Sequence, residues 1–110
     1  MKILIGDHHQ LFRAGLRLLL EPLKDGVAFG EAGTFNELVE QCRGGERYDL
    51  ILMDLGLPGW PGFKGLRAVR ALQPDTPLVV VSASEAVGDM HQVLEQGARG
   101  FIPKSSSSAI

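Results

Sequence analysis

Two aspartates and two histidines at the ends of apolar runs are the residues of this sequence best suited to chemistry. Near the N-terminus, the segment ILIGDHHQ runs through an apolar stretch that stops at Asp7 and continues with His8 and His9. A second apolar run, Leu50–Met53, stops at Asp54. Carboxylate and imidazole groups bind metal ions. These residues therefore form either one site or only the polar edge of buried strands.

Two further polar residues follow apolar runs of the same kind. Ser82 follows LVVV, and Lys104 follows GFIP. In an open parallel sheet the binding site lies beyond the carboxyl ends of the strands, so these two residues should converge with Asp7 and Asp54. Paired carboxylates need a cation between them, and a hydroxyl and an ammonium group suit a phosphoryl group. The set is suited to phosphoryl transfer onto an aspartate.

The elements that position these residues alternate between strand and helix. Apolar runs predict strands at Ile3–Ile5, Val27–Ala32, Leu50–Met53, Leu78–Val81 and Gly100–Pro103. Helical spacing and end signals predict helices at Gln10–Leu20, from the capping box Thr34–Glu37 to Gly44, at Phe63–Leu72 and at Glu85–Gln96. This alternation predicts an α/β fold with an open, doubly wound parallel sheet.

Apolar positions at helical spacing indicate which helix faces meet the sheet. In the first helix they are Phe12, Leu16, Leu19 and Leu20. In the fourth helix they are Val87, Met90, Val93 and Leu94. We expect both sets to point inward.

Composition limits the class of protein. The chain has 110 residues, 45% hydrophobic and 22% charged, which suits one globular domain. Its net charge is -2 and it has no basic cluster, so we expect no direct nucleic-acid contact by this segment. The single cysteine, Cys42, favours a reducing compartment. No apolar run is long enough to span a membrane, and we expect a cytoplasmic protein without membrane contact.

Four segments together resemble a known family. ILIGDHHQLFRAGLRLLL, YDLILMDLGLPGWPGF, PLVVVSAS and GARGFIPKS resemble the receiver domain of two-component response regulators, in particular the NarL/LuxR type, in which a helix-turn-helix DNA-binding domain follows. The resemblance implies a flavodoxin-like five-stranded sheet of order 2-1-3-4-5. It also implies a regulatory domain rather than an enzyme, which accepts a phosphoryl group from a sensor histidine kinase and switches a transcriptional output.

The resemblance also assigns roles to individual residues. It makes Asp54 the phospho-acceptor, Asp7 and the Gly56 carbonyl its partners in holding Mg²⁺, Ser82 and Lys104 the groups that contact the phosphoryl group, and Phe101 the aromatic residue that changes rotamer on activation.

His8 departs from the family pattern. The family has two consecutive acidic residues where this chain has Asp7 and His8, whereas His9 occupies a position where histidine is common. Imidazole is a softer ligand than carboxylate and brings no negative charge, so Mg²⁺ affinity should fall. Three alternatives stay open. His8 binds a transition metal with Asp7 and Asp54, or it is protonated and pairs with Asp54, or it points to solvent.

Two further features differ from the family. The loop GWPG has Pro61 where an acidic residue is common and exposes Trp60 near the site, where it either packs on the loop or contacts a partner. The chain ends in SSSSAI, where the family has a fifth helix. We therefore expect a truncated receiver or one that covers itself by self-association, because even ~300 Å² of bare apolar surface costs about 7 kcal/mol.

Other functions compete with the phosphorylated switch. The alternative is a phosphorylation-independent pseudo-receiver that acts as a protein–protein interaction module. A small flavodoxin-like binding domain is disfavoured because DHHQ lacks the small residues of a phosphate-binding loop. A hydrolase is disfavoured because no nucleophile–base pair is evident outside this cluster.

Overall fold

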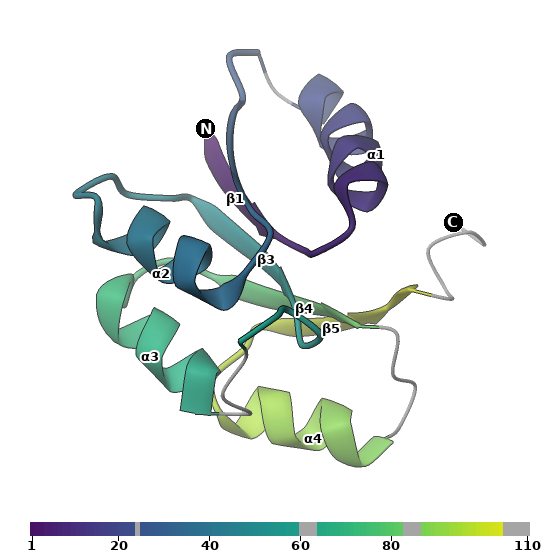
Figure 1. Cartoon of the computed structure of the whole chain (residues 1–110), viewed down its shortest axis with the longest axis vertical. Helices are drawn as coiled ribbons and strands as arrows, with labels where there is room; N and C mark the ends of the chain where they lie inside the picture. The colour runs from purple at the N-terminus through teal and green to yellow at the C-terminus, as the bar shows by residue number, and fades with distance from the viewer. Residues whose placement is uncertain (24, 60–63, 83–86, 105–110) are drawn as a thin grey trace.

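Five parallel strands form one sheet in the computed structural model, which describes residues 1–23, 25–59, 64–82 and 87–104. The strands are β1 (Lys2–Gly6), β2 (Ala28–Ala32), β3 (Leu50–Asp54), β4 (Leu78–Ser82) and β5 (Gly100–Pro103). Their order in the sheet is β2-β1-β3-β4-β5, and every neighbouring pair is parallel (Figure 1). The predicted fold class and strand order are confirmed.

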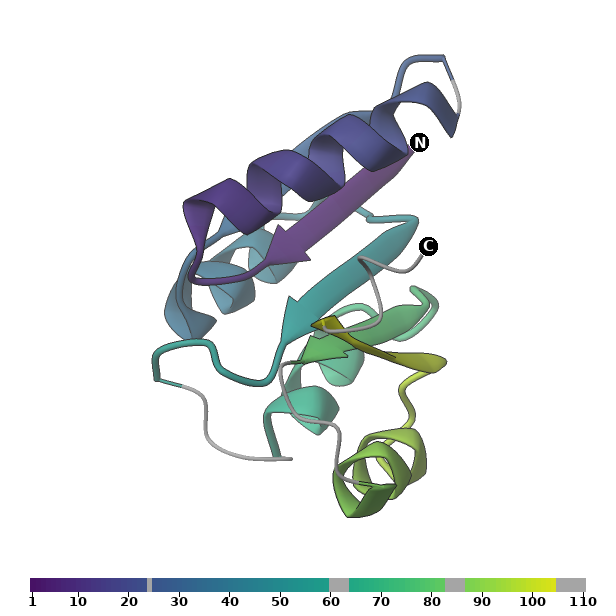
Figure 2. The ribbon, with the colours of Figure 1, turned by 90° about the vertical axis from the view of Figure 1, so that its right-hand side faces the viewer.

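Helices cover both faces of this sheet. They are α1 (Gln10–Leu20), α2 (Phe35–Arg43), α3 (Lys64–Leu72) and α4 (Val87–Glu95), with a 3-10 turn at Glu21–Leu23. α1 lies on one face, and α2, α3 and α4 lie on the other (Figures 1 and 2). The expected first residues of the third and fourth helices, Phe63 and Glu85, lie outside the described residues.

The sheet separates two apolar clusters, because alternate side chains of a strand point to opposite faces. Ile3 and Ile5 of β1 belong to the cluster beneath α1, with Leu52 and Val81. Leu4, between them in β1, belongs to the larger cluster beneath α2, α3 and α4. The central strands are therefore buried on both sides, which fixes the positions of their carboxyl ends.

Two leucines that we expected to point inward are exposed. Leu19 of α1 is 72% exposed, because α1 packs on the sheet along Phe12, Leu16 and Leu20 and leaves Leu19 on its flank. Leu94 of α4 is 44% exposed. Its neighbour Val93 is fully buried, and successive helical residues point about 100° apart. The inward assignment of both leucines was wrong.

The start of α2 confirms the predicted capping signal. Thr34 Oγ1 accepts a hydrogen bond from the Glu37 N–H at 3.1 Å. Glu37 Oε1 in turn accepts one from the Gly33 N–H at 3.0 Å, so the reciprocal bond reaches one residue further back than in the usual capping box. The helix ends before Gly45, whose φ of 82° lies in the left-handed region that glycine tolerates.

Candidate functional site

Asp7 and Asp54 lie at the carboxyl ends of adjacent strands and are both buried. Asp7 directly follows β1 and is 2% exposed, and Asp54 is the last residue of β3 and is 6% exposed. One oxygen of each carboxylate accepts a backbone N–H two residues ahead, from His9 to Asp7 at 2.8 Å and from Gly56 to Asp54 at 3.1 Å. These local bonds hold the carboxylates at the start of their loops.

Lys104 joins the two aspartates. Its Nζ lies 2.9 Å from Asp7 Oδ2 and 3.2 Å from Asp54 Oδ2. The contact with Asp54 has the geometry of a hydrogen bond, whereas Asp7 Oδ2 has the distance of an ion pair without the alignment of a hydrogen bond. Burial favours the neutral amine, but the contacts with Asp7 and Asp54 outweigh it and raise the pKa of Lys104. The predicted convergence of these three residues is observed.

Ser82 and Phe101 lie on the strands beside these residues. Ser82 is the last residue of β4, is 5% exposed and pairs in register with Pro103, the residue before Lys104. Asp54 pairs with Val81, so Ser82 lies one residue further toward the same edge. Phe101 is half-buried, pairs with Val80 and packs against the cluster beneath α2, α3 and α4. Ser82 therefore lies at the same end of the sheet as Asp54, and the Phe101 ring lies against the apolar cluster below that end.

His9, rather than His8, lies next to the carboxylates. His9 Nδ1 is 3.2 Å from Asp7 Oδ1, and donor atoms of Asp7, His9 and Asp54 lie within 4.8 Å of one another. His8 is exposed, with its ring centroid 5.7 Å from that of His9. This geometry corresponds to the alternative in which His8 points to solvent. The sequence reasoning treated His9 only as part of the family pattern and missed it as a neighbour of Asp7.

The donor set can hold a divalent cation, but with less negative charge than two consecutive acidic residues would provide. Asp7 and Asp54 supply hard oxygen ligands of the kind that Mg²⁺ prefers. Lys104 already neutralises one of their two charges. His8 adds no negative charge at the position where a receiver with two consecutive acidic residues has its second carboxylate. We conclude that the carboxylates of Asp7 and Asp54 fit a divalent cation such as Mg²⁺.

Arg13 fixes the backbone from which Asp7 projects. Its Nη1 donates to the Asp7 carbonyl oxygen at 2.5 Å, and its Nε donates to Glu31 Oε1 of β2 at 3.0 Å. Arg17 donates to the other oxygen of Glu31 at 2.8 Å. Burial raises the pKa of Glu31. The two guanidinium groups lower it by a larger amount, so the net pKa of Glu31 is below its ordinary value. The i, i+4 spacing of Arg13 and Arg17 in α1 was the available sequence signal for this network.

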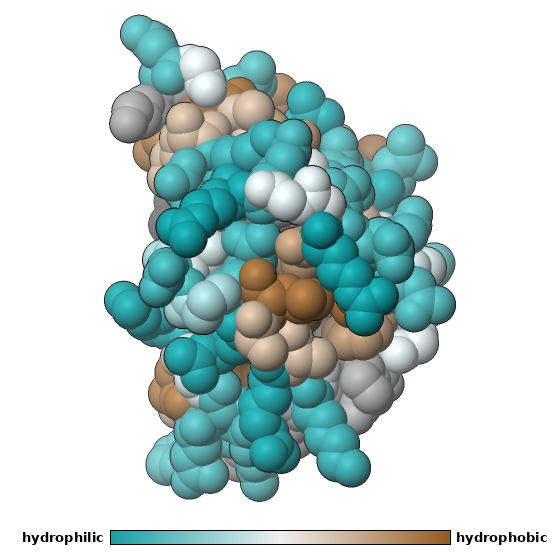
Figure 3. Space-filling view, turned by 90° about the vertical axis from the view of Figure 1, so that its left-hand side faces the viewer, coloured by the Kyte–Doolittle hydropathy of each residue, from teal (hydrophilic) through white to brown (hydrophobic). Residues whose placement is uncertain are grey.

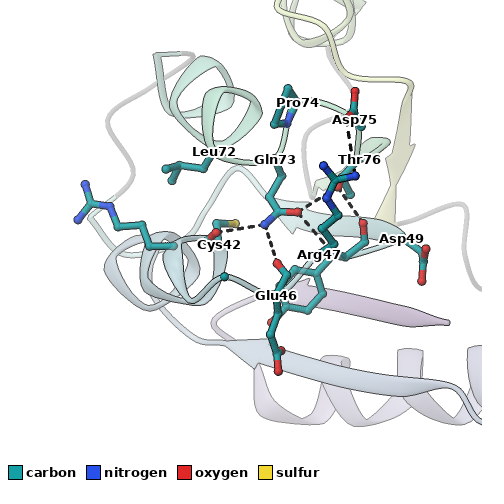
Figure 4. Close-up of a pocket in the computed structure, with 12 residues that line it drawn as sticks. Cys42, Glu46, Arg47, Asp49, Leu72, Gln73, Pro74, Asp75 and Thr76 are labelled. Carbon is teal, nitrogen blue, oxygen red and sulfur yellow. Dashed lines mark hydrogen bonds and ion pairs between the residues drawn. The ribbon is translucent and has the colours of Figure 1, made fainter.

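A polar hollow lies at the opposite edge of the sheet, near the amino end of β3. It is centred on Gln73, whose amide donates to the carbonyl oxygens of Cys42 and Glu46 and accepts from Tyr48 N–H and Thr76 Oγ1 (Figure 4). Figure 3, which views the left-hand side of Figure 1, shows a mainly hydrophilic surface with an apolar patch near its centre. The Gln73 amide is fully engaged in joining chain segments, so we regard this hollow as structural.

Trp60 and Pro61 lie outside the described residues. Gly56 is described and exposed, and its N–H contacts Asp54. Among the helices within the described ranges, none has the length and apolar character needed to cross a bilayer.

This geometry agrees with the comparison with known protein families. The sequence matches the response regulator receiver domain family over residues 3–109. The chain therefore belongs to the response regulator receiver domains, a family of regulatory domains that typically bind Mg²⁺ and interact with sensor histidine kinases.

Relatives and solved structures include transcriptional regulators of this family. The chain is 29% identical over 107 residues to the response regulator UvrY of Escherichia coli K12, covering 97% of this chain and 49% of UvrY. It resembles a LuxR-family response regulator from Aurantimonas with a TM-score of 0.84 and 29% identity, covering 98% of this chain and 76% of that one. The chain spans about half the length of the curated relatives it matches.

A further solved structure of similar fold contains a phosphorylated aspartic acid. A response regulator from Burkholderia pseudomallei, crystallised with a phosphorylated aspartic acid, a calcium ion and citrate, matches with a TM-score of 0.83 and 25% identity. The match covers 94% of this chain and 59% of that one.

Proposed function

We propose that this domain accepts a phosphoryl group on Asp54 from a sensor histidine kinase in the cytoplasm. The observation that supports this proposal is the convergence of two buried carboxylates and Lys104 at one edge of the sheet. An oxygen of Asp54 attacks phosphorus of a phosphohistidine, a P–O bond forms, and the P–N bond breaks. The leaving imidazole nitrogen keeps the electron pair of that bond and takes up a proton.

Each neighbour of Asp54 has a role in this transfer. Lys104 pairs with the new phosphoryl oxygens once Asp54 has lost its own charge, and Ser82 donates its hydroxyl to one of them. Asp7, Asp54 and the Gly56 carbonyl would hold Mg²⁺, which neutralises charge on the transferred group. His8 supplies no carboxylate, so the affinity for Mg²⁺ is lower than in a receiver with two consecutive acidic residues.

Small-molecule phosphodonors test this proposal directly. Wild-type protein incubated with acetyl phosphate and Mg²⁺ should gain the mass of one phosphoryl group, and Asp54→Asn should gain none. Asp75→Asn is the matched control, because Asp75 is an exposed aspartate whose side chain contacts Arg47 and lies outside the site. Equal labelling of Asp54→Asn and wild type would refute Asp54 as the acceptor.

The pseudo-receiver remains the second candidate, and two observations favour it. His8 replaces an acidic residue, and Lys104 already lies between Asp7 and Asp54. Beryllofluoride, a phosphoryl mimic, separates the two functions. A phosphorylation-competent site binds it with Mg²⁺ and shifts the NMR resonances of Ser82 and Phe101, whereas a pseudo-receiver shows no such shift.

We also propose that the parent protein carries a fifth helix and a C-terminal DNA-binding domain that this switch controls. The length of the relatives supports this, because the chain covers 49% of UvrY. Leu11, Leu18 and Leu19 of α1 are at least 72% exposed, which suits cover by a further helix or by a second copy of the chain. Sedimentation of this domain alone, compared with a form extended at its C-terminus, distinguishes self-association from cover within one chain.

A further inference from the structure

Phe12 contacts the ammonium group of Lys104 from the side of α1. Phe12 lies in the first turn of α1, and its ring centroid is 4.4 Å from Lys104 Nζ. A cation within about 6 Å of an aromatic face is attracted by the ring quadrupole, more strongly when water is excluded. The Lys104 side chain is only 18% exposed, so this contact lies in the favourable range.

The ring of Phe12 is held in place by the apolar cluster against which it packs. Phe12 packs with Leu16 and Leu20 against the cluster of Ile3, Ile5, Leu52 and Val81. A lysine side chain has four rotatable bonds and loses much conformational freedom when it is fixed. Contacts with the packed ring and with the two carboxylates therefore restrict the position of the ammonium group.

We propose that Phe12 is a positioning residue that holds Lys104 against Asp7 and Asp54. Its importance for phosphoryl transfer rests on the function proposed above, whereas its effect on Lys104 does not. Leucine at this position would fill most of the apolar space but would offer the ammonium no aromatic face. Tryptophan would offer a stronger one.

Chemical labelling of the lysine amine tests the contact without any phosphodonor. Acetic anhydride in limiting amount, followed by peptide mass analysis, gives the relative reactivity of Lys104. We expect Phe12→Leu to raise the reactivity about three- to tenfold, corresponding to the usual strength of a partly desolvated cation–π contact. Phe12→Trp should leave it unchanged or lower it.

Phe29 provides the matched control. Its ring lies 5.2 Å from the guanidinium carbon of Arg17 and packs in the same apolar cluster as Phe12. Phe29→Leu therefore removes an equivalent ring and a comparable cation contact without touching Lys104, and should change its reactivity less than twofold. If Phe12→Leu fails to fold, Phe12→Met takes its place. Equal reactivity of Lys104 in the Phe12 and Phe29 variants would overturn the proposal.

Phosphorylation rates then distinguish a failure of the Phe12 proposal from a failure of the proposed phosphoryl transfer to Asp54. If acetyl phosphate labels wild type, Phe12→Leu should slow the labelling and Phe12→Trp should retain the wild-type rate. Equal labelling rates for Phe12→Leu and wild type would count against a role of Phe12 in positioning Lys104. If wild type takes up no phosphoryl group, the proposed function fails, and the amine-labelling ratio still decides whether Phe12 holds Lys104.

Discussion

The ammonium nitrogen of Lys104 lies 2.9 Å from Oδ2 of Asp7, although 96 residues separate them in the chain. The contact exists because β1 and β5 end at the same edge of a parallel sheet, with β3 and β4 between them. Asp7 is almost fully buried, so its charge has little solvent to stabilise it and depends on the cation.

Lys104→Met should destabilise the fold. Removing the cation leaves the buried carboxylates of Asp7 and Asp54 to repel each other. We expect a loss of about 2–3 kcal/mol near neutral pH, below the full cost of breaking a buried pair because Lys104 is partly exposed. Urea unfolding measures this loss.

The double variant Asp7→Asn/Lys104→Met controls for the change in side-chain packing. It removes one charge of each sign, so it should recover part of the lost free energy of unfolding. A double variant as unstable as the sum of the two single variants would show that Asp7 and Lys104 do not interact energetically.

His8→Asp should strengthen Mg²⁺ binding. The substitution restores two consecutive carboxylates after β1 and adds a negative charge beside Asp7 and Asp54, so we expect affinity to rise by at least about tenfold. Isothermal titration calorimetry measures it. His8→Asn, which adds no charge, is the control and should bind Mg²⁺ like wild type. Wild-type affinity equal to that of His8→Asp would contradict this role for position 8.

The stability of the fold should decline above pH 9. Burial raises the pKa of the Cys42 thiol from 9.0 to about 11. Between these values the unfolded chain releases the thiol proton and the folded chain keeps it. The stabilising contribution is therefore complete below pH 9 and is lost as the pH rises to about 11, about 2–3 kcal/mol in all. Urea unfolding at successive pH values measures the decline.

Cys42→Ala isolates this effect from the other groups that titrate in alkali. The variant keeps the contribution of Lys104, whose raised pKa lies above 10.5 and whose ion pairs are lost only above that pH. Its free energy of unfolding should be lower at pH 7 because a buried side chain is truncated. It should then fall less steeply than that of wild type from pH 9 upward. Parallel curves for the two proteins would refute the assignment to Cys42.

Gln73→Glu should destabilise the end of the sheet opposite the site. The Gln73 amide donates to the carbonyl oxygens of Cys42 and Glu46, and a carboxylate of nearly the same shape repels both. Gln73 is 7% exposed, so we expect a loss of about 2–4 kcal/mol at neutral pH. Thermal unfolding should show a smaller loss at low pH, where the introduced carboxyl is protonated. Gln92→Glu, at an exposed position on α4, is the control.

The sequence predicted the architecture because its signals are local. Apolar runs marked the five strands, and Thr34 and Glu37 marked the start of α2. The resemblance to a family added the strand order. Leu19 and Leu94 were assigned wrongly because helical spacing identifies a broad apolar arc and does not show which part of it meets the sheet.

The site was predicted less completely, because its remaining features depend on tertiary geometry. The convergence of Asp7, Asp54 and Lys104 followed from the strand ends. The approach of Phe12 to Lys104 depends on how α1 crosses the sheet. His9 reaches Asp7 through the turn after β1, and no spacing rule distinguishes it from His8.

Arg13 connects β2, the outer strand of the sheet, to the candidate site through hydrogen bonds. Its guanidinium spans from Glu31 of β2 to the main chain of Asp7. A substitution on that strand can therefore displace the backbone at Asp7 through the Arg13 side chain, in addition to the direct hydrogen bond from the Asp7 N–H to the Ala32 carbonyl oxygen. Distant edge mutations that alter the reactivity of Asp54 should accordingly cluster on the side of β2 that faces α1.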